Sequence, residues 1–396
     1  MSHRSIRDID LTGKKVFIRV DFNVPLDENG TEVTSDTRIR AALPTIQLAL
    51  RKGAAVILAS HLGRPKGRPK STMSLDPIAP LLEKLLGQHV TKTGDCVGDE
   101  VNHLVAQMSP GDIVLLENLR FHAAEEANDP DFSAQLASLC DVYVNDAFGS
   151  AHRAHSSTEG IARLVHKKAI GLLMEKELEY LTMALSKPER PYIAIVGGAK
   201  ISGKIDVLDR FLELADKILI GGAMTYTFLH AQGIAIGGSL LEKDKLDVAR
   251  TIINKAGDKL VLPKDHVITA KLQADANTRV VDGYNEPIPS NMKGVDIGPA
   301  TVDFYKKTLA NARFIIWNGP MGVFEIPEFA RGTLAMAHAI AESSGLSIVG
   351  GGDSEKAIRT AGVETSITHI STGGGASLEF LAGHRLPGIE VLSKTT

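Results

Sequence analysis

The sequence predicts an α/β protein of two Rossmann-like three-layer domains with parallel sheets, joined by a hinge helix. Its 396 residues exceed what one hydrophobic core usually supports, so two domains are expected. Short apolar runs rich in β-branched residues alternate with longer helical patterns, as is typical of parallel α/β units. Polar residues or glycines follow each run directly, and parallel sheets bind ligands beyond the carboxyl ends of their strands.

The first half contains four such runs, at residues 16–20, 55–59, 113–116 and 142–144. They lead into Asp21 and Asn23, into residues 60–64, into residues 117–120, and into Asn145 and Asp146. One polar loop carries no information, because loops without a function are also polar. Four strand ends that include His and Arg favour a functional edge.

The second half contains five runs, at residues 193–196, 218–220, 314–317, 347–349 and 367–370, and glycine follows each of them closely. Glycine lets the backbone approach a ligand, and the amides of a following helix favour phosphate. A single Gly-Gly pair is usually a tight turn. Five glycine-bearing strand ends favour a phosphate-binding domain.

Residues 172–186 connect the two halves. Their apolar positions are spaced as in a helix, and Pro188 and Pro191 end the pattern. We therefore expect an N-terminal domain at 1–171, a connecting helix at 172–187 and a C-terminal domain at 188–377.

Composition and charge exclude several classes of protein. A net charge of −3 argues against a nucleic-acid partner. Cys96 and Cys140 stand far apart without metal-ligand spacing, which favours a reducing compartment. No apolar run suits a signal peptide or a membrane span, so we expect a cytoplasmic location and no membrane partner.

Residues 198–205 nearly match a P-loop. The G-x-x-x-x-G-K pattern is complete, but Ile205 replaces the Ser or Thr that ligates Mg²⁺. A P-loop ATPase is therefore disfavoured, although Lys200 and Lys204 still suit phosphates. The two lysines could instead be solvated, but a cation is unfavourable at a helix start unless an anion binds there.

Two further segments predict ion binding. Asp353 follows three glycines and is the metal candidate. Taken alone, this residue would be expected about equally often to act as a turn or N-cap residue. His152 and His155 flank Arg153, which would repel a metal ion, so an anion site is favoured. The cations of the first half predict a small, highly anionic substrate, because arginine binds carboxylate and phosphate bidentately; they are Arg38, His61, Arg64, Arg120 and Arg153.

Several stretches together resemble the phosphoglycerate kinase family over essentially the whole chain. They are residues 19–25 (RVDFNVP), 60–65 (SHLGRP), 117–121 (ENLRF), 151–157 (AHRAHSS), 317–325 (WNGPMGVFE), 350–354 (GGGDS) and 371–377 (STGGGAS). The resemblance implies reversible transfer of the acyl phosphate of 1,3-bisphosphoglycerate to MgADP, giving 3-phosphoglycerate and MgATP. It also implies a monomer, Mg²⁺ as the cofactor, and a C-terminal segment, 378–396, that packs back on the N-terminal domain.

The resemblance also implies roles for individual residues. Substrate binding falls to Asp21, Asn23, Arg38, His61, Arg64, Arg120 and Arg153. Nucleotide binding falls to Gly198, Lys200, Lys204, Gly221, Gly222, Gly294, Asn318, Glu325, Gly351, Gly352, Asp353 and Ser354, with Asp353 as the metal ligand. Catalysis is expected from Arg38, Lys200, Gly351 and Gly374.

Both nucleophiles of this reaction are ionised at neutral pH, so no general base is required. Catalysis then rests on in-line positioning and neutralisation of charge, and we expect hinge closure to bring the substrates together. The alternatives are another small-acid kinase and a non-catalytic binding protein of the same fold. No G-x-S-x-G elbow, H-R-D and D-F-G pair, or G-x-G-x-x-G at a suitable strand end supports another enzyme class.

Overall fold

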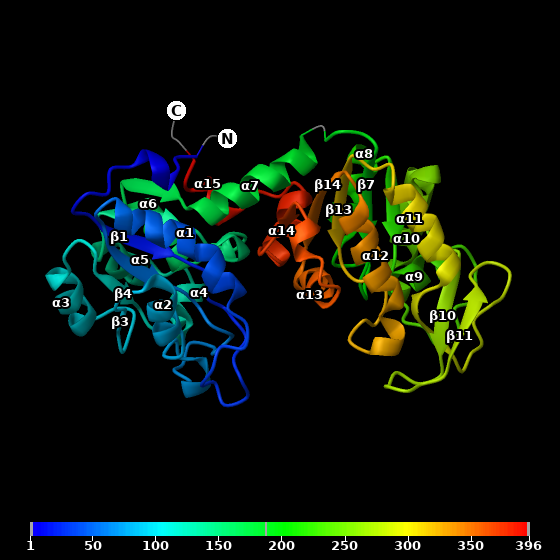
Figure 1. Cartoon of the computed structure of the whole chain (residues 1–396), viewed down its shortest axis with the longest axis horizontal. Helices are drawn as coiled ribbons and strands as arrows, with labels where there is room; N and C mark the ends of the chain where they lie inside the picture. Colours follow the sequence, from blue (N-terminus) through cyan, green and yellow to red (C-terminus); the bar gives the residue numbers. More distant parts are fainter. Residues whose placement is uncertain (1–2, 187, 394–396) are drawn as a thin grey trace. The chain divides into compact units, whose positions relative to one another are not determined.

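The computed structural model describes residues 3–186 and 188–393 (Figure 1). The chain divides into two compact units. Unit 1 runs to Glu179 and resumes at Arg385, and unit 2 comprises Tyr180–His384.

Unit 1 is built on a six-stranded parallel sheet of order β3-β4-β2-β1-β5-β6. Its strands are β1 (Lys15–Arg19), β2 (Ala55–Ala59), β3 (Thr91–Lys92), β4 (Ile113–Leu115), β5 (Val142–Asn145) and β6 (Lys167–Ile170). The chain moves from β1 to β2 in one direction and later places β5 on the other side of β1. Such a reversal opens a crevice at the carboxyl edge of an open sheet.

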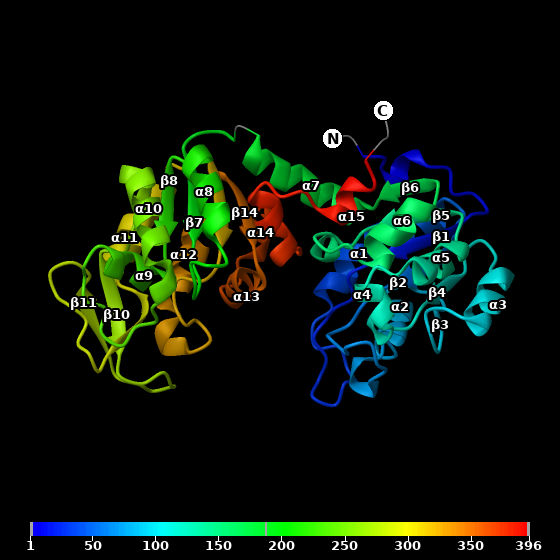
Figure 2. The same cartoon turned by 180° about the vertical axis from the view of Figure 1, so that it is seen from behind.

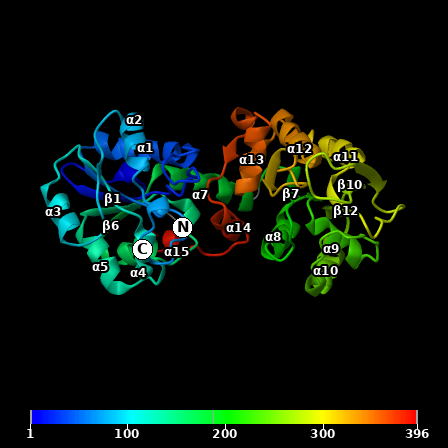
Figure 3. The same ribbon diagram turned by 90° about the horizontal axis from the view of Figure 1, so that it is seen from below.

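Helices cover both faces of this sheet (Figure 3). They are α1 (Thr37–Arg51), α2 (Ile78–Leu86), α3 (Asp99–Gln107), α4 (Ala123–Glu126), α5 (Pro130–Ser138), α6 (Ile161–Leu164) and α15 (Pro387–Glu390). Short single turns are η1 (Ile6–Asp8), η2 (Ser71–Met73), η3 (Leu119–Phe121), η4 (Phe148–Ser150) and η5 (Ser156–Gly160). Alternate strand residues such as Val16 and Ile18 pack with Ile39 and Ile46 of α1, as the two-residue strand period requires.

Helix α7 (Leu172–Leu185) begins in unit 1, and the division between the units falls within it. Oδ1 of Asp146 accepts hydrogen bonds from the amides of Leu173 and Met174, at 2.9 and 3.1 Å, and so satisfies two donors at its first turn. His3 forms an antiparallel bridge with Ser393. The C-terminal helix α15 lies among the elements of unit 1 (Figure 2). The domain boundaries expected from the sequence stay a prediction.

Unit 2 has a second six-stranded parallel sheet, of order β15-β14-β13-β7-β8-β9. Its strands are β7 (Tyr192–Val196), β8 (Lys217–Ile220), β9 (Leu260–Val261), β13 (Phe314–Asn318), β14 (Leu346–Gly350) and β15 (His369–Ile370). The order reverses at β7, which pairs with both β8 and β13.

The helices of unit 2 again lie on both faces of the sheet (Figure 3). They are α8 (Ile205–Leu214), α9 (Met224–Ala231), α10 (Leu246–Ala256), α11 (Pro299–Leu309), α12 (Arg331–Glu342), α13 (Gly352–Thr360) and α14 (Gly375–Leu381). Short turns are η6 (Lys243–Lys245), η7 (Gly257–Lys259), η8 (Pro327–Phe329) and η9 (Glu364–Ser366). Trp317 is fully buried in the core that α11, α12 and α13 form against the sheet.

The α/β class with two parallel sheets is confirmed. The edge strands β3, β6 and β9 and an antiparallel sheet of order β11-β10-β12 were not expected from the sequence. This sheet comprises β10 (Asp265–Thr269), β11 (Thr278–Asp282) and β12 (Lys293–Ile297). In the described part of the chain, none of the helices is both long and apolar enough to cross a membrane.

Candidate active site

A basic cluster lies at the carboxyl edge of the unit 1 sheet. It comprises Arg19, Arg38, His61, Arg120 and Arg153. Burial, and then the guanidinium groups of Arg19, Arg120 and Arg38, hold the pKa of His61 well below its usual range. Burial, Arg120, Arg19 and Arg153 likewise lower the pKa of His155, to about 4. These cations therefore lie close enough to the two imidazoles to disfavour their protonation.

Arg38 is fixed by the loop that follows β1. Its Nη1 donates to Oδ2 of Asp21 at 3.3 Å and to the carbonyl oxygen of Asn23 at 3.0 Å. Oδ1 of Asn23 accepts a hydrogen bond from the amide of Gly63, at 2.9 Å, which joins this loop to the loop after β2. The Arg38 side chain is 32% exposed, so the guanidinium stays accessible to an anion.

The other predicted cations lie on the neighbouring loops. Arg120 donates to the carbonyl oxygen of Gly63 at 2.9 Å and lies 3.3 Å from a carboxylate oxygen of Glu126. Arg153 donates from Nε to the ring of His152 at 3.1 Å. Arg64 is exposed on the loop that carries His61. The substrate residues predicted from the sequence therefore lie on adjoining loops and, for Arg38, on the first turn of α1.

Arg19 determines the proton position of His61. Nη2 of Arg19 lies 3.1 Å from Nδ1 of His61. An arginine can only donate, so Nδ1 is the acceptor and the neutral ring carries its proton on Nε2. A neutral imidazole in this form can donate its Nε2 proton to an anionic oxygen.

Arg19 is itself held in a buried polar network. It is 1% exposed and donates from Nε to Oγ of Ser157 at 2.8 Å. Ser157 donates through its amide and its hydroxyl to Glu125, at 2.9 and 2.5 Å. Burial raises the pKa of Glu125, and the Arg19 guanidinium acts in the opposite direction. This network fixes the position of Arg19 within the basic cluster.

In unit 2, hydrogen bonds join the loops at the carboxyl ends of the strands. The amide of Gly197 donates to the carbonyl oxygen of Asn318, and that of Gly198 to Pro320, both at 2.9 Å. Nδ2 of Asn318 donates to the carbonyl oxygen of Gly350 at 3.0 Å. Position 222 requires glycine, since a Cβ there would lie 2.4 Å from backbone atoms of Gly198.

These loops enclose two adjoining pockets that share Gly198, Ala199, Pro320 and Asp353. The first, of about 260 Å³, is lined in part by Gly222, Tyr226, Gly294, Val323 and Glu325. The second, of about 340 Å³, is lined in part by Lys200, Lys204, Asn318, Gly351, Gly352, Ser354 and Gly374. The predicted nucleotide residues thus line one or the other, except Gly221, where an added Cβ would lie 2.4 Å from the Met321 sulfur.

The second pocket, which contains Lys200 and Lys204 and is called the polar pocket below, suits phosphate groups. Nζ of Lys204 donates to Oδ1 of Asn318 and, at 3.1 Å, to its carbonyl oxygen. Burial lowers the pKa of Lys204 to about 8, while the carboxylate of Asp353 acts to raise it. Positive charge therefore lies close to the start of α13, whose amides favour anions.

Asp353 fits the role of a Mg²⁺ ligand. It is exposed in the first turn of α13 and lines both pockets. No hydrogen bond to its carboxylate is formed within the described residues. Mg²⁺ is usually held by one or two carboxylates together with phosphate oxygens and water. A nucleotide phosphate in the polar pocket would complete such a ligand set.

Tyr226 lines the first pocket, which is called the apolar pocket below. A Cβ on Gly294 would lie 1.7 Å from the hydroxyl oxygen of Tyr226, so only glycine fits there. Asp296, 3% exposed, accepts hydrogen bonds from the amides of Ile297 and Gly332, at 2.9 and 2.6 Å. Burial raises the pKa of Asp296 to about 7. The space beside these groups, also lined by Val295, Met321 and Val323, suits a nucleoside base.

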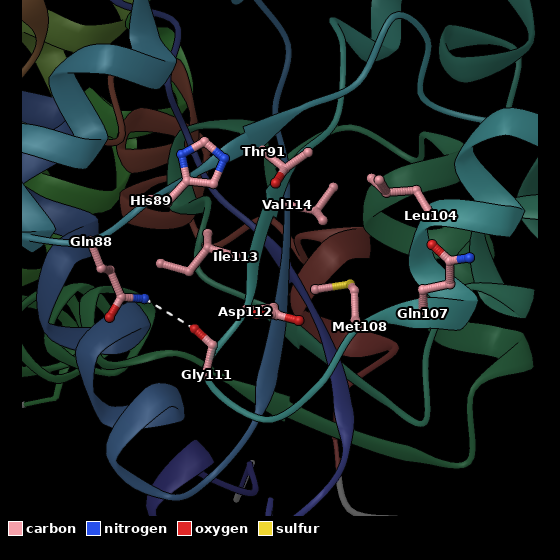
Figure 4. A pocket seen from close by; sticks show the side chains of 10 residues that line it. All are labelled: Gln88, His89, Thr91, Leu104, Gln107, Met108, Gly111, Asp112, Ile113 and Val114. Carbon is pink, nitrogen blue, oxygen red and sulfur yellow. Dashed lines mark hydrogen bonds between the residues drawn. The ribbon is translucent and has the colours of Figure 1, made fainter.

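A separate hollow of about 400 Å³ lies in unit 1, at the amino ends of β3 and β4 (Figure 4). Gln88, Gln107 and Asp112 line it, and Nε2 of Gln88 donates to the carbonyl oxygen of Gly111 at 3.1 Å. None of the predicted residues lies there. Ligands of open parallel sheets bind at the opposite edge, so we assign no part of the reaction to it.

Several residues that support these sites were not singled out from the sequence. Arg19 carried a signal, because it is charged within an otherwise apolar strand run. Glu125 and Tyr226 gave no comparable signal, since their roles depend on contacts between segments far apart in the sequence. An open sheet with a basic cluster and a second with a two-part phosphate and base pocket define a two-domain small-molecule kinase.

Comparisons with known proteins agree with this class. The family model described as phosphoglycerate kinase matches residues 6–384. The chain is 58% identical to the phosphoglycerate kinase of Solibacter usitatus and 55% identical to that of Acidobacterium capsulatum, with 100% of each chain covered. It also resembles the solved phosphoglycerate kinase of Coxiella burnetii, at 40% identity and a TM-score of 0.87, with 99% of each chain covered. The chain belongs to the phosphoglycerate kinase family, and it is a phosphotransferase.

Proposed function

We propose that the chain catalyses the reversible transfer of the acyl phosphate of 1,3-bisphosphoglycerate to MgADP, giving 3-phosphoglycerate and MgATP, as a step of glycolysis. One observation carries this proposal. A cluster of arginines with a neutral His61 N–H lies at the carboxyl edge of the unit 1 sheet, and a two-part pocket of nucleotide size lies at the carboxyl edge of the unit 2 sheet. The first suits a small polyanion and the second suits a base with its phosphates.

In unit 1, the basic cluster binds phosphoglycerate. Arg120, Arg153, Arg64 and the Nε2 proton of His61 hold the phosphate of C3, and Asp21, Asn23 and Arg38 lie at the acid end. Arg38 is both accessible and fixed by Asp21, so it neutralises the charge that develops on the transferring group. These roles rest on the family likeness and on the contacts described above.

In unit 2, the apolar pocket takes the nucleoside and the polar pocket its phosphates. Lys204 and the amides at Gly351 and Gly374 bind phosphate oxygens, Glu325 binds the ribose, and Lys200 approaches the transferring phosphoryl group. Asp353 holds Mg²⁺, which when bound neutralises phosphate charge and fixes the orientation of the nucleotide. No general base is needed, because each attacking oxygen is already ionised near neutral pH.

Two substrates bound to two units must meet for direct in-line transfer. We therefore propose that the units close about α7 when both substrates are bound, which also excludes water from the acyl phosphate. Small-angle X-ray scattering should give a smaller radius of gyration with both substrates than with either one. An unchanged value would contradict closure.

Family likeness supports a monomer, while the net charge of −3 and the two separated cysteines support a cytoplasmic protein without a nucleic-acid partner. Size-exclusion chromatography with light scattering tests the monomer.

Mg²⁺-dependent ADP formation from MgATP tests the function, with 3-phosphoglycerate, acetate or aspartate as acceptor. We expect turnover with 3-phosphoglycerate and its loss in EDTA. Preference for acetate or aspartate would identify another acid kinase, and nucleotide binding without turnover would identify a binding protein.

A further inference from the structure

A carboxylate occupies the amides of the loop that nearly forms a P-loop. Oε2 of Glu242 lies 2.5 Å from the amide nitrogen of Ile201 and 3.4 Å from that of Ser202. In a true P-loop, successive amides of this kind cradle phosphate oxygens. Here the chain supplies its own anion to two of them.

Glu242 is held from the opposite side as well. Its amide donates to Oγ1 of Thr227, at 3.3 Å, and Thr227 is a buried residue of α9. At the start of the same helix, the amide of Met224 donates to the carbonyl oxygen of Gly198, at 3.1 Å. Glu242 therefore fastens the loop after β7 to the helix that follows β8.

The fastened turn carries both lysines of the polar pocket. Lys200 precedes it directly, and the amide of Lys204 closes it by donating to the carbonyl oxygen of Ile201, at 2.8 Å. The Ile201 side chain is fully buried, so it anchors the turn in the protein core. A carboxylate that fixes Ile201 and Ser202 thus limits where the two lysines can project.

We propose that Glu242 is a positioning residue that acts as an internal anion and fixes Lys200 and Lys204 for the nucleotide phosphates. Since Glu242 takes the amides of Ile201 and Ser202, phosphate must be bound by the lysines, the start of α13 and the metal. This division explains how the loop can bind phosphates without the Ser or Thr of a P-loop. The inference rests on the proposed nucleotide site.

The test compares Glu242→Ala and Glu242→Gln with Asp244→Asn. Gln retains an oxygen acceptor without the charge, and Asp244 is an exposed carboxylate of the same segment. We expect Glu242→Ala to raise KM and Kd for the magnesium nucleotide about 10-fold, since a charge-assisted hydrogen bond is lost. Glu242→Gln should recover part of this loss, and Asp244→Asn should stay within about 2-fold of wild type. The KM for 3-phosphoglycerate should change little.

Calorimetric titration of MgADP into each folded variant measures the nucleotide site without the reaction. Unchanged nucleotide affinity in Glu242→Ala would overturn the proposal. Tighter binding would also overturn it, because Glu242 would then be a competitor of phosphate. Equal losses for both substrates with a lower Tm would assign Glu242 a general structural role. A wild type that binds MgADP without phosphorylating 3-phosphoglycerate would refute the proposed function and leave this test valid.

Discussion

Nη2 of Arg19 lies 3.1 Å from Nδ1 of His61, and this contact makes Nδ1 the acceptor, so the proton of the neutral ring is on Nε2. The arginine also bonds to Ser157, which in turn bonds to Glu125, so the orientation is held by a buried network. A buried charge with several partners has little freedom to move. The chain's own hydrogen bonds thus organise this edge of the unit 1 sheet.

His61 should remain neutral with its proton on Nε2 between about pH 6 and pH 8. Burial and the arginines depress its pKa, so its contribution to stability is present above the ordinary value of 6.5 and is lost as the pH falls below it. Nitrogen-15 NMR of the imidazole measures the tautomer and the titration. Arg19→Met should raise the pKa of His61, because the guanidinium that lowers it is removed. A protonated His61 at neutral pH in the wild type would contradict the assignment.

Arg38→Ala should lower kcat about 100-fold, the size of effect seen when one donor to developing charge is lost. The KM for 3-phosphoglycerate should change less, since the other arginines of the cluster remain. Arg40→Ala is the matched control, because Arg40 lies on the same helix and pairs with Asp36 at 2.8 Å. Steady-state kinetics separate the two parameters. A rise in KM at unchanged kcat would assign Arg38 to binding alone.

The positions of the main strands could be predicted because each is a short apolar run closed by chemistry-bearing residues. β7, for example, extends the predicted run 193–196 by one residue, Tyr192. Of the strands that were missed, β3 and β6 contain lysines, and β9 is only two residues long, Leu260–Val261. The three-stranded sheet β10–β12 was missed because the strands of β11 and β12 carry exposed residues and glycine instead of an apolar run.

The site could be predicted where a residue type carries its own chemistry. His61 follows β2 and Asp353 follows β14, and the shared direction of the strands brings such residues to the carboxyl edge of each parallel sheet. Glu242 and Glu125 could not be found in this way. They act by accepting hydrogen bonds from segments that are 41 and 32 residues away in the chain, and a glutamate on a helix or loop is usually only a solvated group.

Asp353→Asn should raise the Mg²⁺ concentration needed for half-maximal activity by roughly 10-fold or more. The amide retains one oxygen but lacks the charge that favours a hard divalent cation. The Asp353→Asn substitution should also lower the pKa of Lys204 further, because the Asp353 carboxylate raises that pKa in the wild type. Activity measured against free Mg²⁺ tests the first effect. Glu355→Gln is the control, since Glu355 lies on the same helix and pairs with Arg359 at 3.1 Å. Equal Mg²⁺ dependence in both variants would contradict the metal assignment.

Asp146 should make the start of α7 sensitive to pH. Burial raises the pKa of Asp146 to about 7 from the ordinary 3.8, against the effect of hydrogen bonds from Thr45, Met174 and Leu173, and nearby Glu175 adds to the rise. The folded protein therefore favours the protonated form. The stabilising contribution is full below about pH 4 and is lost as the pH rises toward about 7, at roughly 1 kcal/mol per unit.

Asp146→Asn removes this titration while it keeps an oxygen for the amides of Leu173 and Met174. Compared with this variant, the wild type should therefore lose stability as the pH rises from about 5 to about 7, and the difference should level off above that range. Urea unfolding at several pH values measures the difference in free energy. Asp131→Asn, which alters an exposed carboxylate of unit 1, should show no such slope. If the wild type and Asp146→Asn differed by a constant amount at every pH, the carboxyl group of Asp146 would not titrate in this range, and the helix start would be held by hydrogen bonding alone.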